Sequence, residues 1–242
     1  MPSESLTVLT YNLYNHHDGE SAFANRIEAL AATIADTTPD VVCLQEAPST
    51  DFLRALAAFL SHRQKRALRL ACTEMRRPDG WSEFLAIIHP GTTRAARVHA
   101  APTGEHVGIS VATAALGITV INAHLDPHSP GARHAQAGVL LRALPQSGPV
   151  LLCGDLNGTP GGETLSLLQT RLSALAPPPG VERTYPTGLR TDMAGTAGLV
   201  LDHILGRDMR VEACGLAGDE PVGGAWPSDH VAVWAKVSLA VL

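Results

Sequence analysis

The chain contains very little lysine, and its charge balance is acidic. Of its 242 residues only Lys65 and Lys236 are lysine, 16 are arginine, and the formal net charge is −5. A broad surface that binds nucleic acid non-specifically needs an excess of basic side chains, because such binding depends on neutralising phosphates. The composition argues against a surface of this kind. It still allows a small pocket in which arginine binds phosphate through its forked guanidinium group.

Cysteine is also scarce, and the four that occur form no C-x-x-C pair. A zinc ribbon or a disulfide framework is therefore not expected, and Cys43 and Cys153, which lie in apolar runs, are predicted to be buried free thiols. No apolar run approaches the length of a membrane span, and residues 1–5 lack the basic and apolar stretches that begin a signal peptide. These absences predict a cytoplasmic protein without a transmembrane segment.

The chain does have enough apolar sequence for a large core. Apolar residues make up 45% of it and charged residues 17%. No internal repeat, low-complexity tail or shift in composition marks a boundary along the sequence. We therefore expect one domain that spans residues 1–242.

Apolar patterning predicts more strands than helices. Strands are expected at residues 6–13, 41–44, 66–72, 84–89, 107–113, 117–123, 150–153, 199–205 and 231–239, and helices at 22–37, 51–60, 130–144 and 159–172. The segments 177–190 and 215–227 are rich in proline and glycine and are expected to be loops. Because strands occur both in a hairpin and after helices, the pattern favours a layered α/β domain with mixed or antiparallel sheets.

Six short motifs carry residues that can hold a metal ion or a phosphate. They are Thr10-Tyr11-Asn12, Gln45-Glu46, Asn122-Ala123-His124-Leu125-Asp126, Gly154-Asp155-Leu156-Asn157, Leu201-Asp202-His203 and Ser228-Asp229-His230. Each is weak alone, because these residue types are common. Four of the six follow a run that is typical of a buried strand, which suggests that several strand ends bring polar groups to one place.

Oxygen ligands dominate this set. The carboxylates and amides of Asn12, Glu46, Asp155, Asn157 and Asp229 suit Mg²⁺ or Mn²⁺, and the lack of an H-E-x-x-H motif or a cysteine cluster makes zinc the weaker choice. Glu46 directly follows a predicted strand, where a carboxylate is costly unless it faces a metal or a partner. An exposed carboxylate at a helix N-terminus explains Glu46 equally well at this point.

Asp155 and Asn157 are two residues apart, so in an extended segment they would point the same way and could hold a water and a phosphoryl oxygen. The alternative is an ordinary Gly-Asp-x-Asn turn. His124 and His230 are each close to a carboxylate in sequence and could hold a proton facing a phosphate, although a buried structural histidine is the commoner case. Asp202 could orient an imidazole, or simply cap a strand end.

The ordered set of motifs resembles the endonuclease/exonuclease/phosphatase superfamily over nearly the whole chain, from Leu6 to about Val237. The resemblance implies a four-layer α/β sandwich, in which two packed β-sheets are flanked by helices, and a phosphoester hydrolase that depends on Mg²⁺ or Mn²⁺. It also implies roles for single residues. Glu46 would be the principal metal ligand with Asn12 and Asp229 in support, Asp155 would orient or deprotonate the attacking water, Asn157 and His124 would bind the phosphate, and His230, fixed by Asp202, would stabilise the transition state.

The chain departs from part of the family. Tyr14 stands where some apurinic endonucleases carry an aspartate, so the metal shell is expected to differ from theirs. The segment from His124 to Gln136, and Arg183-Thr184-Tyr185-Pro186, look like a bacterial subgroup that mixes nucleases with phosphodiesterases acting on lipids or small molecules. The substrate, whether nucleic acid, phospholipid headgroup or small phosphoester, therefore stays open. A catalytically silent phosphate-binding protein on the same scaffold is a less favoured alternative, because Glu46 and Asp155 are intact.

Overall fold

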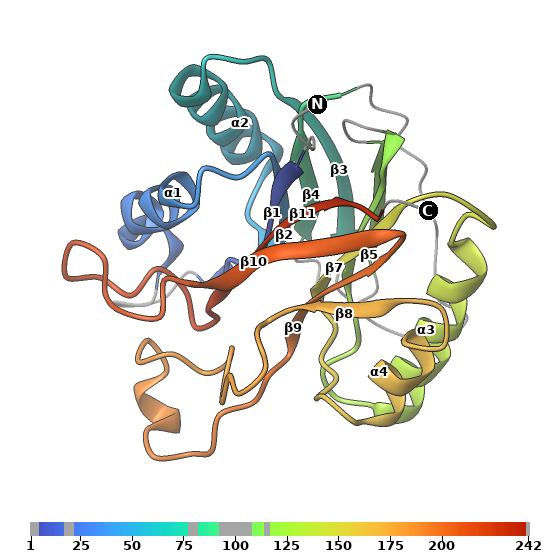
Figure 1. Ribbon diagram of the computed structural model, residues 1–242. Helices are drawn as coiled ribbons and strands as arrows, with labels where there is room; N and C mark the ends of the chain where they lie inside the picture. The colour runs from blue at the N-terminus through green and yellow to red at the C-terminus, as the bar shows by residue number, and fades with distance from the viewer. Residues whose placement is uncertain (1–4, 17–21, 77–81, 92–107, 114–116, 241–242) are drawn as a thin grey trace.

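The computed structural model describes residues 5–16, 22–76, 82–91, 108–113 and 117–240. Two β-sheets pack face to face, and helices cover their outer faces, which gives the expected four-layer α/β sandwich (Figure 1). Each sheet is mixed, because β1 and β2 are parallel in one and β6 and β7 in the other. Among the described residues, no helix combines the length and apolarity that crossing a membrane requires.

The first sheet has six strands in the order β10-β11-β1-β2-β4-β3. Their bounds are β1 (Ser5–Asn12), β2 (Val41–Ala47), β3 (Arg69–Arg76), β4 (Ser82–His89), β10 (Met209–Ala217) and β11 (Ala232–Leu239). The second sheet has five strands in the order β5-β6-β7-β9-β8. Their bounds are β5 (Gly108–Thr113), β6 (Thr119–His124), β7 (Val150–Asp155), β8 (Ser173–Ala176) and β9 (Asp202–Arg207).

Helices α1 (Ile27–Asp36) and α2 (Thr50–Gln64) pack on the first sheet, and α3 (Pro130–Ala143) and α4 (Glu163–Leu168) pack on the second. Short 3₁₀ helices occur at Phe23–Asn25 and Thr191–Met193. A third apolar cluster fills the space between the sheets and includes Cys43 and Cys153, both buried free thiols as predicted. Burial raises the pKa of Cys43 well above its ordinary value.

A polar contact crosses this apolar interior and ties the sheets together. Asn122 of β6 donates its Nδ2 hydrogens to the carbonyl oxygens of Leu44, at 2.8 Å, and Ala86, at 2.9 Å, in the other sheet. Its Oδ1 accepts a hydrogen bond of 2.6 Å from Gln45 Nε2. Buried amides need such partners, because an unsatisfied one costs about 1–3 kcal/mol. The network fixes the offset between β2 and β6 close to their carboxyl ends.

Most predicted elements are present, with shifted ends. The helix expected at 22–37 begins only at Ile27, after a 3₁₀ turn. The helix expected at 159–172 is wrong over much of its length: Gly161 has a φ of +78° and Gly162 caps the short α4, so helical backbone starts at Glu163. Strands β8 and β10 were not expected, and the predicted loop at 215–227 includes the end of β10. The turn of the predicted hairpin, at 114–116, lies outside the described residues.

Gly154 shows why β7 needs a glycine where it leads into the Asp155-Leu156-Asn157 segment. It has a φ of +147°, and a Cβ atom there would overlap the carbonyl oxygen of Ala123 on the neighbouring strand.

We predict that Gly154→Ala lowers the free energy of unfolding by about 3 kcal/mol or more, because backbone strain and the steric overlap both oppose the alanine side chain. Urea denaturation measures this. Gly148→Ala is the control, since Gly148 also has a positive φ (+87°) but faces open space; equal losses in both variants would contradict the steric argument.

Candidate active site

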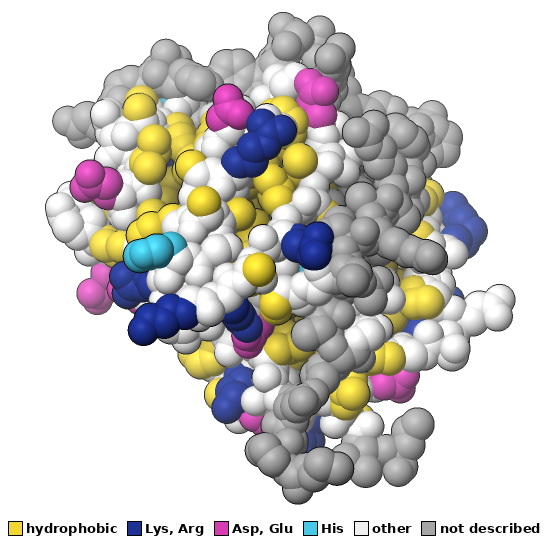
Figure 2. All heavy atoms as spheres, turned by 90° about the horizontal axis from the view of Figure 1, so that it is seen from above, with side chains coloured by type: hydrophobic (Ala, Val, Ile, Leu, Met, Phe, Trp, Pro, Cys, Tyr) yellow, Lys and Arg dark blue, Asp and Glu magenta, His cyan; other side chains and the backbone are white. Residues whose placement is uncertain are grey.

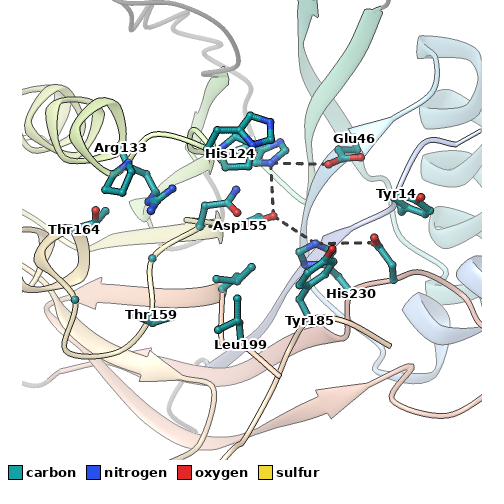
Figure 3. A pocket seen from close by; sticks show the side chains of 18 of the residues that line it. Tyr14, Glu46, His124, Arg133, Asp155, Thr159, Thr164, Tyr185, Leu199 and His230 are labelled. Atoms are coloured by element: carbon teal, nitrogen blue, oxygen red, sulfur yellow. Dashed lines mark hydrogen bonds and ion pairs between the residues drawn. The ribbon is translucent and has the colours of Figure 1, made fainter. Parts of the chain in front are cut away.

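A cavity of about 760 Å³ opens where strands of both sheets end. Six of the eight side chains selected from the sequence line it: Glu46, His124, Asp155, Asn157, Asp229 and His230. The other two, Asn12 and Asp202, are buried behind this surface and contact the lining residues directly. Figure 3 shows the labelled side chains converging from several separate elements. The sequence motifs, distant along the chain, therefore meet in one place.

Glu46 enters the cavity through an irregularity in β2. The pairing of β2 with β4 shifts register between Leu44 and Ala47, and Glu46 has a φ of +53°. This bulge interrupts the regular alternation of side chains and leaves the Glu46 side chain 16% exposed on the cavity wall. Left-handed backbone at a non-glycine residue is uncommon, and such strain is concentrated at functional sites.

Asn12 links a carboxylate of each sheet. Its Nδ2 donates to Glu46 Oε1 and to Asp155 Oδ2, each at 3.1 Å. Its Oδ1 accepts a 3.0 Å hydrogen bond from the backbone N–H of Tyr14. In this orientation the Asn12 amide nitrogen positions the two carboxylates, and Oδ1, which accepts one N–H, keeps a second lone pair.

The expectation that Asp155 and Asn157 share an extended backbone was wrong. Asn157 has a φ of +47°, and its N–H donates to Asp155 Oδ1 at 3.0 Å, which closes the turn that was the alternative prediction. Asn157 Nδ2 donates to the carbonyl oxygen of Leu125 at 2.9 Å. Both side chains nevertheless line the cavity. The turn and the site are thus the same structure.

Asp155 lies between two imidazoles. Its Oδ2 is 3.6 Å from His124 Nε2 and 3.6 Å from His230 Nε2. His124 Nε2 is also 4.0 Å from Glu46 Oε1. All of these groups except Glu46 are buried. A phosphoryl group that enters this space meets two nitrogen donors and a carboxylate within a few ångströms.

Behind His230, Asp202 holds the other ring nitrogen. Asp202 Oδ2 is 2.9 Å from His230 Nδ1, and Asp202 is fully buried. The Thr184 hydroxyl accepts hydrogen bonds from the backbone N–H groups of Leu201 and Asp202, which fixes the start of β9. Burial lowers the pKa of His230, but the adjacent Asp202 and Asp155 carboxylates outweigh it and raise that pKa well above its ordinary value. These two carboxylates therefore favour the charged form of His230.

Asp229 contributes a buried carboxylate with an unsatisfied oxygen. Burial raises its pKa to about 7; the neighbouring Glu46 adds to this, whereas His230 and Arg190 oppose it. Arg190 Nη1 lies 3.7 Å from Asp229 Oδ2, but Asp229 Oδ1 has no hydrogen-bond partner among the described residues. A buried acceptor without a donor, close to a second carboxylate, fits a divalent cation.

A second group of potential metal ligands overlaps this one. Asp155, Asp202 and His230 place one ligand atom each within 4.8 Å of one another, close enough to hold a metal ion. In the arrangement seen, however, the imidazole separates the two carboxylates, with Asp202 at Nδ1 and Asp155 facing Nε2. This geometry is that of an imidazole oriented by Asp202, whereas Glu46 and Asp229 line the cavity and, among the described residues, Asp229 Oδ1 has no hydrogen-bond partner.

Part of the cavity wall was not predicted. Tyr14, Arg133, Tyr185, Arg190 and Leu199 line it beside the selected residues. The ring of Tyr185 lies 4.8 Å from that of His230, and Arg190 Nη1 donates to the Tyr185 hydroxyl at 3.0 Å. Arg183-Thr184-Tyr185-Pro186 had been noted as a sequence feature, but Arg190 and Leu199 lie in or near glycine-rich loops that give no comparable signal.

Known structures resemble the whole fold. A conserved protein of unknown function from Enterococcus faecalis V583 has a TM-score of 0.75 at 23% identity, covering 97% of this chain and 100% of that one. Truncated TDP2 from Caenorhabditis elegans has a TM-score of 0.72 at 20% identity, covering 97% of both chains. A mannosyl-6-phosphatase from Bacteroides thetaiotaomicron VPI-5482 has a TM-score of 0.71 at 16% identity, covering 97% and 100%. At these identities the likeness establishes the fold alone.

Comparison of sequences identifies the family of the chain, which the structural likeness does not. A search of curated proteins found no match. The model of the Endonuclease/Exonuclease/phosphatase family matches residues 9–230, which contain all six motifs. Because that match spans most of the chain, and the fold and the converging motifs agree with it, the protein belongs to the endonuclease/exonuclease/phosphatase family.

Proposed function

We propose that the protein is a divalent-metal-dependent phosphoester hydrolase that acts as a phosphodiesterase, by in-line attack of an activated water. One observation carries the proposal: Asp155 lies 3.6 Å from two imidazoles, beside the carboxylates of Glu46 and Asp229, in a cavity open to substrate. Phosphoryl transfer depends on positioning and charge stabilisation more than on covalent catalysis. A cluster of this composition supplies both.

Glu46 and Asp229 would hold Mg²⁺ or Mn²⁺, and Asn12 would keep Glu46 in place. The unsatisfied Asp229 Oδ1 supports this assignment, since binding a cation satisfies it and favours the charged form of Asp229. When bound, the ion would neutralise charge that develops on the phosphoryl oxygens. Oxygen ligands alone also favour these hard cations over zinc.

Asp155 would hold the attacking water and accept its proton. Its position is fixed from two sides, because Asn12 donates to Oδ2 and the Asn157 N–H donates to Oδ1. Such double anchoring reduces the motion of the carboxylate and so favours a productive orientation of the water. The contact from Asn12 also connects this carboxylate to Glu46.

His124, Asn157 and His230 would bind the phosphoryl oxygens. Asp202 would stabilise the imidazolium form of His230, and it holds the ring so that Nε2 points towards the Asp155 side of the cavity. A preorganised charged donor is most effective where negative charge grows in the transition state. Asp202 acts only through His230, since it is fully buried.

The volume of the cavity and the acidic net charge favour a small phosphoester over a long nucleic acid. A volume of about 760 Å³ lies within the usual range for small-molecule sites. The formal net charge of −5 also disfavours a long nucleic-acid partner, and on the face shown in Figure 2, seen from above, basic and acidic side chains both occur. A nuclease of this fold would need a basic groove. The hydrolysis panel below also includes nucleic acid and a phospholipid as alternative substrates.

A hydrolysis panel tests the proposal. It contains bis(p-nitrophenyl) phosphate, p-nitrophenyl phosphate, abasic duplex DNA, single-stranded DNA and sphingomyelin, each with Mg²⁺, with Mn²⁺ and with EDTA. We expect metal-dependent turnover of at least one diester, lost in EDTA and restored by excess Mg²⁺ or Mn²⁺, because the carboxylates otherwise lack their counter-charge. Turnover that survives EDTA would contradict the mechanism. Phosphate binding without hydrolysis of any substrate would support the silent binding protein instead.

A further inference from the structure

Arg133 is a cation in the cavity to which the mechanism above gives no role. It belongs to α3, is half-buried and lines the pocket. In Figure 3 it lies with Thr164 on the side of the pocket away from Glu46 and Tyr14. Thr164, at the start of α4, is itself buried and lines the same cavity. Two separate helices thus bring donor groups to this end of the pocket.

The backbone that follows β6 fixes the position of this guanidinium. Arg133 Nη1 donates to the carbonyl oxygen of Asp126 at 2.7 Å, and Asn157 Nδ2 donates to that of Leu125 at 2.9 Å. The carbonyl that Arg133 contacts is therefore one residue farther along the chain from His124 than the carbonyl that Asn157 contacts. Successive Cα atoms are about 3.8 Å apart, which sets the scale of this step. Gln136 Oε1 accepts the Asp126 N–H at 2.9 Å and holds the same residue in place.

The charge of Arg133 is not neutralised within the described part of the chain. Its hydrogen bond is to a backbone carbonyl, and no described carboxylate lies within ion-pair distance of it. Arg190, the other arginine of the cavity, differs: Asp192 accepts from its Nε and Nη2 at 2.9 and 2.8 Å. Glu163 also lines the cavity, but it is exposed and therefore solvated. Within the ranges that the structure describes, Arg133 has one hydrogen-bond acceptor, so most of its N–H donors have no partner there.

We propose that Arg133, with the Thr164 hydroxyl, forms a subsite for a second anionic group on the substrate. The scissile phosphate would occupy the space between Asp155, His124 and His230, and Arg133 would bind a phosphate or carboxylate one step farther out. The inference rests on the proposed function, and it narrows the substrate to phosphoesters that carry a second negative charge. A guanidinium fork suits such a group, because it can donate two parallel hydrogen bonds to one oxyanion.

A matched series of substrates tests the subsite. It consists of p-nitrophenyl alkyl phosphodiesters of equal chain length whose alkyl ends carry a hydroxyl, a carboxylate or a phosphate. We expect the wild-type protein to prefer the charged ends, and Arg133→Gln to lower the ratio of kcat/KM between charged and neutral substrates about 10-fold or more, the usual effect of losing a charged hydrogen bond. Thr164→Val should lower the same ratio by a smaller factor. The carboxylate and phosphate arms show which oxyanion is bound.

The ratio of kcat/KM between charged and neutral substrates separates loss of the anion subsite from a general loss of activity. A disturbed Asp126 loop, or an Arg133 that binds the scissile phosphate itself, would slow all three substrates equally and leave the ratio unchanged, which would overturn the proposal. Arg142→Gln removes a charge from the exposed part of the same helix and should not change the ratio. If no substrate is cleaved, the proposed function fails separately. The affinities of the three uncleaved diesters for wild-type and Arg133→Gln protein, measured by calorimetry, then decide the subsite by the same ratio.

Discussion

Asp155→Asn is expected to lower kcat by at least ~100-fold, the usual scale for removing a general base. The substitution keeps the shape of the side chain, and the asparagine oxygen can still accept hydrogen bonds from Asn12 or from the Asn157 backbone. What is lost is the negative charge and the capacity to take a proton. Steady-state kinetics on the best diester of the panel, with saturating metal, measures the effect. Circular dichroism and thermal unfolding confirm that the variant is folded.

Asp126→Asn is the matched control for this variant. Asp126 is also buried and lies on the loop after β6, but its Oδ1 accepts the backbone N–H groups of His128 and Ser129 ahead of α3. Asparagine fills such a position as well as aspartate does. We expect activity within about threefold of wild type. Full activity in Asp155→Asn, or an equal loss in both variants, would refute the assigned role of Asp155.

His230→Ala is expected to lower kcat by ~100-fold or more, because it removes a charged donor from the position where transition-state charge develops. Asp202→Asn should cost about 10–100-fold, the usual effect of removing the group that orients a functional imidazole. In Asp202→Asn the ring loses the carboxylate that accepts its Nδ1–H and sustains its charge. Rates at saturating substrate and metal measure both effects.

The double variant distinguishes a positioning role from an independent one. If Asp202 acts only through His230, Asp202→Asn in the background of His230→Ala should cause little further loss in kcat. Multiplicative losses would show that Asp202 contributes separately, as a metal ligand would. Because Asp202, Asp155 and His230 lie close enough to bind an ion, this cycle also decides whether Asp202 orients His230 or binds a metal at that position.

The sequence was most informative where an apolar run ends in a polar motif. Val41–Ala47 and Val150–Asp155 are strands with nearly every residue buried, so their composition alone identifies them. The order of the motifs predicted the four-layer sandwich and selected six side chains that line one cavity. In contrast, β10 is an edge strand with mixed burial that carries Arg210, Glu212 and Gly215, a composition that resembles a loop.

Other features depend on the backbone and could not be read from composition. The left-handed conformations of Glu46 and Asn157 turn their side chains by breaking the alternation on which strand predictions rely. Arg190 and Leu199 reach the cavity because the loops before β9 fold over it, and loop paths have no period. Arg133 lay in the segment from His124 to Gln136 that resembled a bacterial subgroup, without a role of its own; its place at the cavity depends on the Asp126 carbonyl that holds it.

The hydrogen bonds of Asn122 join the two sheets that together carry the candidate site. Glu46 belongs to one sheet, His124, Asp155 and Asp202 to the other, and the network at Asn122 sets how the sheets are offset. The distance between Glu46, the proposed metal ligand, and Asp155, the proposed base, therefore depends on how the two sheets are aligned. Stabilising one sheet alone would not hold this distance constant. The precision of the site therefore depends on the contacts between the two sheets.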